Sequence, residues 1–248
     1  MRAALALARR GLGQVWPNPA VGCVLTKRGA VIGRGWTQSG GRPHAETQAL
    51  ARAGAGGCGA TAYVSLEPCA HHGRTPPCAE ALASAGIARV VVACLDPDPR
   101  VAGKGVAMLQ DAGVKVEEGV AADEAQEINA GFLSMIERGR PLVTLKVATS
   151  LDGCIATHGG ESRWITGDIA RAHVHLLRAR YDAVAVGSGT VLADRPELTC
   201  RLPGLLERSP VRVVFDGRLR TPLTSPLVAT ARSQPLWILT LQGVDPVR

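Results

Sequence analysis

The sequence has few aromatic residues and no long apolar run. Phe, Trp and Tyr make up only 3% of its 248 residues, although 46% are hydrophobic, so we expect a folded core of aliphatic side chains. No apolar run approaches the ~20 residues that a membrane-spanning helix needs. The apolar N-terminal stretch is bracketed by Arg2, Arg9 and Arg10, unlike a signal peptide. We therefore expect a cytoplasmic protein without a membrane partner.

Acidic residues are also in deficit, with 21 Asp and Glu against 28 Lys and Arg, a formal net charge of +7. This charge favours anionic partners. Because there is no long basic run, we favour a phosphorylated small molecule over nucleic acid. The seven cysteines are odd in number and are not the disulfide framework of a small secreted domain. Five of them are interpreted as core or incidental residues: Cys23, Cys58, Cys94, Cys154 and Cys200.

Strand and helix patterns alternate along the first part of the chain, which predicts an α/β domain with helices on both faces of a sheet. Strands are expected at 20–36 (a hairpin turning at 27–29), 61–68, 88–96 and 114–120. Helices are expected at 1–10, 41–54, 78–86, 105–113 and 122–139.

The pattern breaks at 137–141, ERGRP, where we place a domain boundary near residue 139. The two expected domains are therefore 1–139 and 140–248. In the second, strands are expected at 141–153, 182–190, 210–217 and 235–241, with a helix at 168–181.

A stiff polar loop, LEPCAHHGRTPPC at 66–78, follows the strand pattern of 61–68. Its prolines exclude an ordinary helix or central strand. Together with HAE at 44–46, it supplies His44, Cys69 and Cys78 as three zinc ligands, the number typical of a catalytic site with one open position. H-x-E followed by P-C and a further Cys is typical of zinc deaminases, in which a Glu that does not bind the metal moves the proton. Glu46 has that position.

Plainer interpretations exist for each part of this motif. His44 could be a polar residue at a helix start, Cys69 and Cys78 could be small buried side chains, and a structural zinc could take His71 or His72 as a fourth ligand. The order of HAE and EPC on matching elements favours the catalytic zinc site.

Several motifs together resemble a known family, the bifunctional deaminase/reductase of riboflavin biosynthesis. They are PNPAVGCV, HAE, LEPCAHHGRTPPC, DPDPRVAGKG, KVATSLDGCIA, GESRWITG and GSGTVLADRPELTCR, in the family's order over nearly the whole chain. Cytidine and tRNA-adenosine deaminases resemble only the HAE and PC part. The resemblance implies a cytidine-deaminase-like three-layer α/β/α zinc domain followed by a partial dihydrofolate-reductase-like α/β domain, in a family expected to form homo-oligomers.

The resemblance also implies two reactions. The deaminase removes the 2-amino group of 2,5-diamino-6-(5-phosphoribosylamino)pyrimidin-4(3H)-one, and the reductase uses NADPH to open the ribosyl group into a ribityl chain. In the deaminase it makes His44, Cys69 and Cys78 the zinc ligands, Glu46 the proton shuttle, and Asn18, His71 and Arg74 substrate contacts. An amide can hydrogen-bond to the edge of a heterocycle and Arg suits a phosphate, although Asn18 could equally hold its own turn.

In the reductase, the resemblance implies an NADPH site at Ala148, Trp164, Thr190 and Asp194, and a substrate site at Ser162, Arg178, Leu198 and Arg201. Either Arg could instead be a solvated surface residue, and Trp164 could be core. Residues 217–248 lack the acidic residue and Gly-rich loop with which the family holds NADP phosphates. We therefore expect this chain by itself to be a poor reductase that associates through an unfinished sheet.

Two other functions stay open at this level. A nucleoside or tRNA deaminase would account for the basic net charge. It would not account for the eight residues between Cys69 and Cys78, where the usual signature has two, or for the second domain. A non-catalytic zinc-stabilised module would keep the ligands but would not need Glu46.

Overall fold

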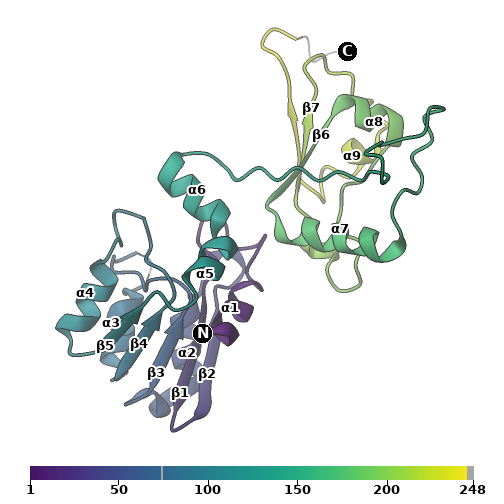
Figure 1. Cartoon of the computed structure of the whole chain (residues 1–248). Helices are drawn as coiled ribbons and strands as arrows, with labels where there is room; N and C mark the ends of the chain where they lie inside the picture. The colour runs from purple at the N-terminus through teal and green to yellow at the C-terminus, as the bar shows by residue number, and fades with distance from the viewer. Residues whose placement is uncertain (74, 245–248) are drawn as a thin grey trace. The chain divides into compact units, whose positions relative to one another are not determined.

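The computed structural model describes residues 1–73 and 75–244, which divide into two compact units, Met1–Val143 and a second beginning at Thr144. The boundary that we expect near residue 139 lies a few residues before this division and stays a prediction. Figure 1 shows each unit as a sheet with helices.

The first unit has a five-stranded sheet of order β2-β1-β3-β4-β5, with β1 antiparallel to β2 and β3, and β3, β4 and β5 parallel. Its strands are β1 (Gly22–Lys27), β2 (Ala30–Trp36), β3 (Thr61–Val64), β4 (Arg89–Val92) and β5 (Lys115–Glu118). Its helices are α1 (Arg2–Ala8), α2 (Ala45–Ala53), α3 (Cys78–Ser84), α4 (Lys104–Asp111), α5 (Ala122–Ile128) and α6 (Ala130–Arg138), with short 3-10 turns η1 (Ser39–Gly41) and η2 (Gly54–Gly57).

Helices cover both faces of this sheet, and glycines let them approach it closely. A Cβ at Gly22 would lie 1.9 Å from the carbonyl oxygen of Ala4 in α1, and one at Gly35 would lie 2.1 Å from that of Ala45 in α2. Gly35 pairs with Cys23, the neighbour of Gly22 in β1. Because successive residues of a strand face opposite sides, α1 and α2 lie on opposite faces. Helix α5 contacts α1 on one face, and α3 contacts both α2 and α4 on the other. This arrangement of helices on both faces of the sheet confirms the predicted three layers.

The helix expected at 122–139 is instead two helices, α5 and α6, divided at Asn129 (φ −101°, ψ 15°). The Asn129 side chain is buried and bonds both main-chain groups of Ala20, accepting from its N–H at 2.8 Å and donating to its oxygen at 3.1 Å. This tertiary contact, which periodicity cannot reveal, coincides with the break.

The second unit has a three-stranded parallel sheet of order β6-β7-β8. Its strands are β6 (Ala183–Gly187), β7 (Val211–Phe215) and β8 (Leu236–Leu239). Its helices are α7 (Asp168–Arg180), α8 (Ser188–Asp194) and α9 (Pro226–Ala229), with a 3-10 turn η3 (Leu206–Arg208).

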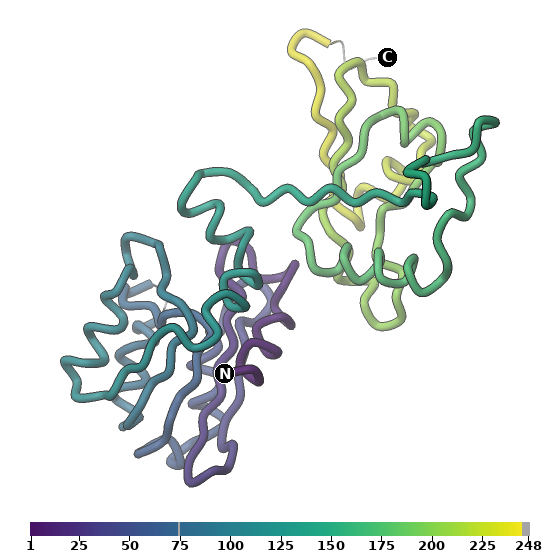
Figure 2. The backbone as a smooth tube through the Cα atoms, viewed as in Figure 1, coloured from purple at the N-terminus to yellow at the C-terminus, as the bar shows by residue number. Residues whose placement is uncertain are grey.

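Two expectations for this unit are wrong. The strand expected at 141–153 has no regular secondary structure, and its extended backbone can be followed in Figure 2. Its alternating apolar residues Val143, Leu145 and Val147 are 84%, 85% and 61% exposed, because no described strand pairs with this segment. The strand expected at 182–190 ends at Gly187, where α8 begins.

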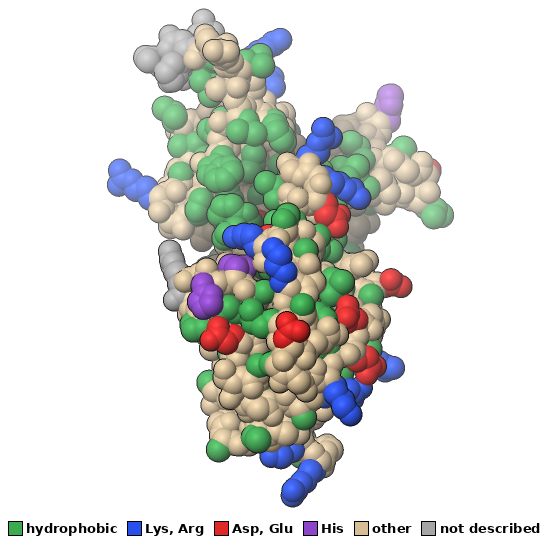
Figure 3. All heavy atoms as spheres, turned by 90° about the vertical axis from the view of Figure 1, so that its left-hand side faces the viewer, with side chains coloured by type: hydrophobic (Ala, Val, Ile, Leu, Met, Phe, Trp, Pro, Cys, Tyr) green, Lys and Arg blue, Asp and Glu red, His purple; other side chains and the backbone are tan. Residues whose placement is uncertain are grey.

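One face of the second sheet packs in a small core, and the other is exposed. Val184, Val186, Val214 and Leu236 contact the buried Val191, Leu198 and Leu227. On the opposite face Phe215, Trp237 and Leu239 are 57%, 60% and 48% exposed. Hydrophobic side chains gather on the surface of this unit in Figure 3. In the described part of the chain, no helix is long and apolar enough to cross a membrane.

Candidate metal centre

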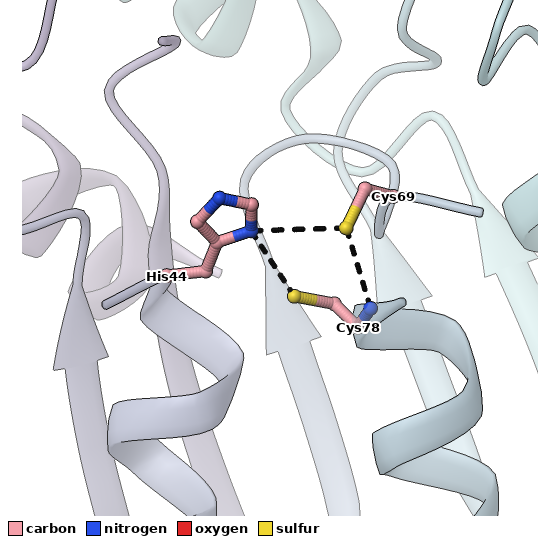
Figure 4. Close-up of side chains that lie close together, drawn as sticks. All are labelled: His44, Cys69 and Cys78. Carbon is pink, nitrogen blue, oxygen red and sulfur yellow. Dashed lines mark hydrogen bonds between the residues drawn. The ribbon is translucent and has the colours of Figure 1, made fainter. Parts of the chain in front are cut away.

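The ends of three separate elements bring His44, Cys69 and Cys78 together (Figure 4). His44 is the N-cap of α2, Cys78 is the first residue of α3, and Cys69 lies in the loop that follows β3. His44 Nδ1 lies 3.3 Å from Cys78 Sγ and 3.7 Å from Cys69 Sγ, and the three ligand atoms all lie within 4.8 Å of one another.

Local hydrogen bonds fix the two cysteines against each other. The main-chain N–H of Cys78 donates to Cys69 Sγ at 3.3 Å, and the N–H of Ala79 donates to the oxygen of Cys69 at 3.2 Å. These are N–H groups of the first turn of α3, which have no partner within the helix. Cys69 therefore caps the helix on which Cys78 stands, and the loop between them closes back on itself.

These spacings fit a tetrahedral zinc ion. Zn–S bonds of about 2.3 Å and Zn–N bonds of about 2.0 Å place neighbouring ligand atoms roughly 3.5 Å apart. The contacts of His44 Nδ1 with the two sulfur atoms have this length. Two thiol groups and one imidazole are the ligand set of a site that keeps a fourth position open.

The charge distribution also suits a cation. A side-chain hydrogen bond from the Cys78 thiol lowers the pKa of Cys69 to about 4, with a further contribution from His44. The same bond, together with burial, raises the pKa of Cys78, and the bond to Cys69 raises that of His44. A divalent ion held between the two sulfur atoms would favour the thiolate form of both.

Glu46 is buried beside these ligands, at the second residue of α2, and is 3% exposed. Burial raises the pKa of its carboxyl to about 7, a shift that His44 opposes and Cys69 reinforces. A carboxyl group with a pKa near neutrality can both accept and release a proton under physiological conditions.

Two of the three expected substrate contacts of the deaminase are described. The side chain of Asn18 packs against Gly41 (φ +82°), where a Cβ would lie 1.9 Å from Asn18 Nδ2. Asn18 is thus placed against the segment that leads into His44. His71 Nδ1 is buried and has no hydrogen-bond partner within the described residues. Arg74 lies outside the described residues.

Glu67, which the sequence analysis missed, is 3% exposed and accepts hydrogen bonds from four main-chain N–H groups. They belong to the segment that joins β4 to α4 and to the first turn of α4. The signal was available, because Glu67 lies three residues after the end of β3 and directly follows the buried Leu66. An acid in that position is buried only if it has partners.

The acidic loop, which we define as residues 95–103, contains Asp96 and Asp98, both buried. Burial raises the pKa of Asp96 to about 6. Arg100 donates from Nε to both oxygens of Asp98 at 3.0 Å and lowers the pKa of that carboxyl, and His71 is close enough to contribute in the same direction. The hydrogen bonds of Glu67 to both ends of the acidic loop place this loop beside the segment that leads into Cys69.

In the second unit, the expected substrate residues Arg178, Leu198 and Arg201 come together at α7 and the segment after α8. Arg178 Nη1 donates to the oxygen of Thr199 at 3.0 Å, next to the buried Leu198, and the charge of Arg201 contributes to lowering the pKa of Arg178, after burial. His175, which was not predicted, accepts from the N–H of Arg201 at 3.2 Å. Ser162 is exposed in an irregular segment.

The four expected NADPH residues are not joined to one another by any hydrogen bond or ion pair among the described residues. Thr190 and Asp194 lie exposed on α8, and Ala148 lies in the irregular segment that precedes α7. Trp164 is 70% exposed under the guanidinium of Arg171. A polar cluster that was not predicted from the sequence lies at the carboxyl ends of β6 and β7, where parallel sheets commonly bind ligands. There Ser188 accepts from Arg220 Nη2 at 2.8 Å, and Asp216 Oδ2 accepts from Thr221.

Two family models match the chain. Residues 1–94 match the cytidine and deoxycytidylate deaminase zinc-binding region, and residues 141–247 match the RibD C-terminal domain. Among curated relatives, the riboflavin biosynthesis protein RibD of Aquifex aeolicus is 46% identical over 96% of this chain and 67% of its own length. The chain belongs to the RibD family of riboflavin biosynthesis proteins. This confirms the predicted fold class of a cytidine-deaminase-like domain followed by a reductase-type domain.

Solved structures agree with this assignment. The chain has a TM-score of 0.87 and 49% identity with RibD of Acinetobacter baumannii, covering 97% of this chain and 68% of that one. With the diaminohydroxyphosphoribosylaminopyrimidine deaminase/5-amino-6-(5-phosphoribosylamino)uracil reductase of Thermotoga maritima it has a TM-score of 0.89 and 42% identity, covering 99% and 70%. RibD of Bacillus amyloliquefaciens is 47% identical over 99% of this chain, which spans 66% of that relative's length.

Proposed function

We propose that the first unit catalyses the hydrolytic deamination of 2,5-diamino-6-(5-phosphoribosylamino)pyrimidin-4(3H)-one, forming 5-amino-6-(5-phosphoribosylamino)uracil and ammonia. The observation that carries this proposal is the convergence of His44, Cys69 and Cys78 with the buried Glu46. The name of the Thermotoga maritima relative, which matches 99% of this chain, supports this choice of substrate.

Each side chain of the centre has a distinct task in this proposal. His44, Cys69 and Cys78 hold a zinc ion and leave one position for the reactants. When bound, zinc acts as a Lewis acid that lowers the pKa of water. Glu46 accepts one proton of the attacking water and passes it to the ring nitrogen. It then accepts the second proton, from the hydroxyl group added to the ring carbon, and passes it to the departing amino group, which leaves as ammonia.

Asn18, His71 and Arg74 contact the substrate in this proposal. The buried, unpartnered Nδ1 of His71 supports its part, because a buried polar atom without a partner is costly unless a ligand or water satisfies it. The net charge of +7 also suits a phosphorylated substrate.

The test is ammonia release from the diaminopyrimidine ribotide by the zinc-loaded chain and by Glu46→Gln. Loss of a general acid-base group should slow release by about 10²- to 10⁴-fold, while zinc content stays at the wild-type level. Glu118→Gln, at an exposed position of β5, is the matched control and should behave as the wild type. A zinc-loaded wild type that releases no ammonia would overturn the proposal, and cytidine and tRNA would then be tried as substrates.

We also propose that the second unit has the fold of an NADPH-dependent reductase acting on the deamination product. Arg178 and Arg201 would bind the substrate phosphate, with Ser162 and Leu198 beside it, and Ala148, Trp164, Thr190 and Asp194 would line the NADPH site. The exposed sheet face supports the expectation that this chain by itself reduces poorly. NADPH absorbance should stay nearly constant after deamination is complete, and NADPH should not raise the melting temperature; a clear upward shift would contradict this expectation.

A further inference from the structure

Glu67 is a buried carboxylate whose partners are main-chain groups of a different segment. Its Oε2 accepts from the N–H groups of Asp96 at 3.3 Å and Gly103 at 3.0 Å. Its Oε1 accepts from those of Gly105 at 2.9 Å and Val106 at 3.1 Å. Both oxygens are therefore occupied as acceptors, which is the condition under which a buried carboxylate is stable.

The four donors enclose the acidic loop. The N–H of Asp96 lies at its start and that of Gly103 at its end, while Gly105 and Val106 belong to the first turn of α4, whose N–H groups have no partner in the helix. One side chain thus fixes both ends of the loop and favours the helix that follows through its negative charge.

The backbone around Glu67 is held in the same way. The N–H of Glu67 donates to the oxygen of Cys94 at 3.0 Å. The next residue, Pro68, places its oxygen so close to α4 that a Cβ at Gly105 would lie 2.0 Å from it. Cys69 follows directly, so the segment that fixes the acidic loop also leads into a zinc ligand.

We propose that Glu67 is a positioning residue of the deaminase site, which holds the acidic loop, with Asp96 and Asp98, against the Cys69 loop beside His71. This role rests on the proposed deaminase function, because it concerns the same site. Glu67 touches neither the expected metal position nor the expected substrate atoms, and it acts through the segments that it joins. Removing its second acceptor oxygen should misplace the loop while the three zinc ligands remain.

The test compares Glu67→Gln, Glu67→Asp and the control Glu118→Gln in the zinc-loaded chain. An amide presents an N–H₂ group to one pair of these N–H donors, so Glu67→Gln should lose two acceptor contacts. We expect kcat/KM for ammonia release to fall by about 10- to 100-fold, the range typical of residues that orient a metal site. Zinc content should stay stoichiometric. Hydrogen–deuterium exchange should quicken at the amides of 96, 103, 105 and 106 but not in β1.

Glu67→Asp keeps a carboxylate on a shorter side chain and should fall between the wild type and Glu67→Gln. If Glu67→Gln does not fold, Glu67→Asp serves as the test. This variant must then show both the faster amide exchange in the acidic loop and the reduced kcat/KM. Unchanged kinetics, or a lower kcat/KM that appears only together with a lower melting temperature and faster amide exchange throughout the first unit, would reduce Glu67 to a structural role and overturn the inference. A wild type that releases no ammonia would instead overturn the proposed function, a result distinguishable from a defect confined to the variants.

Discussion

The two sheets of this chain differ in how many of their faces are buried. The first is covered on both faces, and its core consists of aliphatic side chains such as Leu25, Leu82 and Val92, each of which is 0% exposed. The second is a parallel sheet with one exposed apolar face, although parallel sheets are normally buried on both faces. Helices thus cover both faces of the first sheet, whereas one face of the second sheet leaves apolar side chains exposed.

The centres of the two sheets differ as well. The largest fully buried side chain of the chain is Arg212 in β7, which is 0% exposed. Its guanidinium donates to the main-chain oxygens of Glu197, Leu227, Gln234 and Pro235 and to Thr230 Oγ1. Loops around the second sheet are thus held by a buried cation, whereas the acidic loop of the first unit is held by a buried carboxylate, that of Glu67.

The largest effect on stability should come from Arg212→Met. The substitution leaves several buried oxygens without a donor, and each costs about 1–3 kcal/mol, so we expect the second unit to lose about 4 kcal/mol. Hydrogen exchange resolved by unit should show the loss in residues 183–239 and not in the first sheet. Arg232→Met, at an exposed position between α9 and β8, is the control. Equal protection in both proteins would show that the second unit does not depend on Arg212.

Leu82→Ala should have the next largest effect, confined to the first unit. Leu82 is 0% exposed in α3, and truncating a buried Leu costs about 2–5 kcal/mol; we expect about 3 kcal/mol. Leu239→Ala, at a position that is 48% exposed on the second sheet, should cost less than about 1 kcal/mol. Denaturant melts followed by exchange in each unit would measure both, and similar costs for the two variants would contradict the comparison.

Zinc removal should destabilise the first unit and leave the second unchanged. At free zinc a hundredfold above its Kd, binding to the folded state contributes about 2.7 kcal/mol. Melting curves with zinc and after chelation would measure it. The same experiment on His44→Ala should show little response to zinc, and a shift confined to the second unit would argue against the proposed ligands.

Trp237→Ser should have the smallest effect on stability. It should nevertheless measurably reduce self-association. Trp237 is 60% exposed on the uncovered face, so the change should alter stability by no more than about 0.5 kcal/mol. Because large exposed apolar patches favour association, light scattering should report less self-association than in the wild type. Trp16→Ser, at a 73% exposed position of the first unit, should leave association unchanged.

Much of the metal centre was predictable from local sequence. HAE and PC lie where a helix begins and a strand has ended, and such ends place side chains at one edge of a sheet. Glu67 was missed because its four partners lie about thirty to forty residues further along the chain, and no periodicity encodes that contact. The strand expected at 141–153 was wrong for a related reason, since alternation of apolar residues shows strand propensity and a strand also needs a neighbour.

The sequence by itself determined the two α/β units, the three candidate metal ligands with Glu46 beside them, and the family. These follow from periodicity and from short motifs, because the residues that define each pattern are close together in the sequence. Only the tertiary structure decided that Asn129 divides a helix, that Glu67 holds the acidic loop, that Arg212 lies at the centre of the second sheet, and that one face of that sheet is exposed. Each of these depends on which distant groups meet, and burial turns a polar side chain from a surface residue into an obligatory hydrogen-bonding partner.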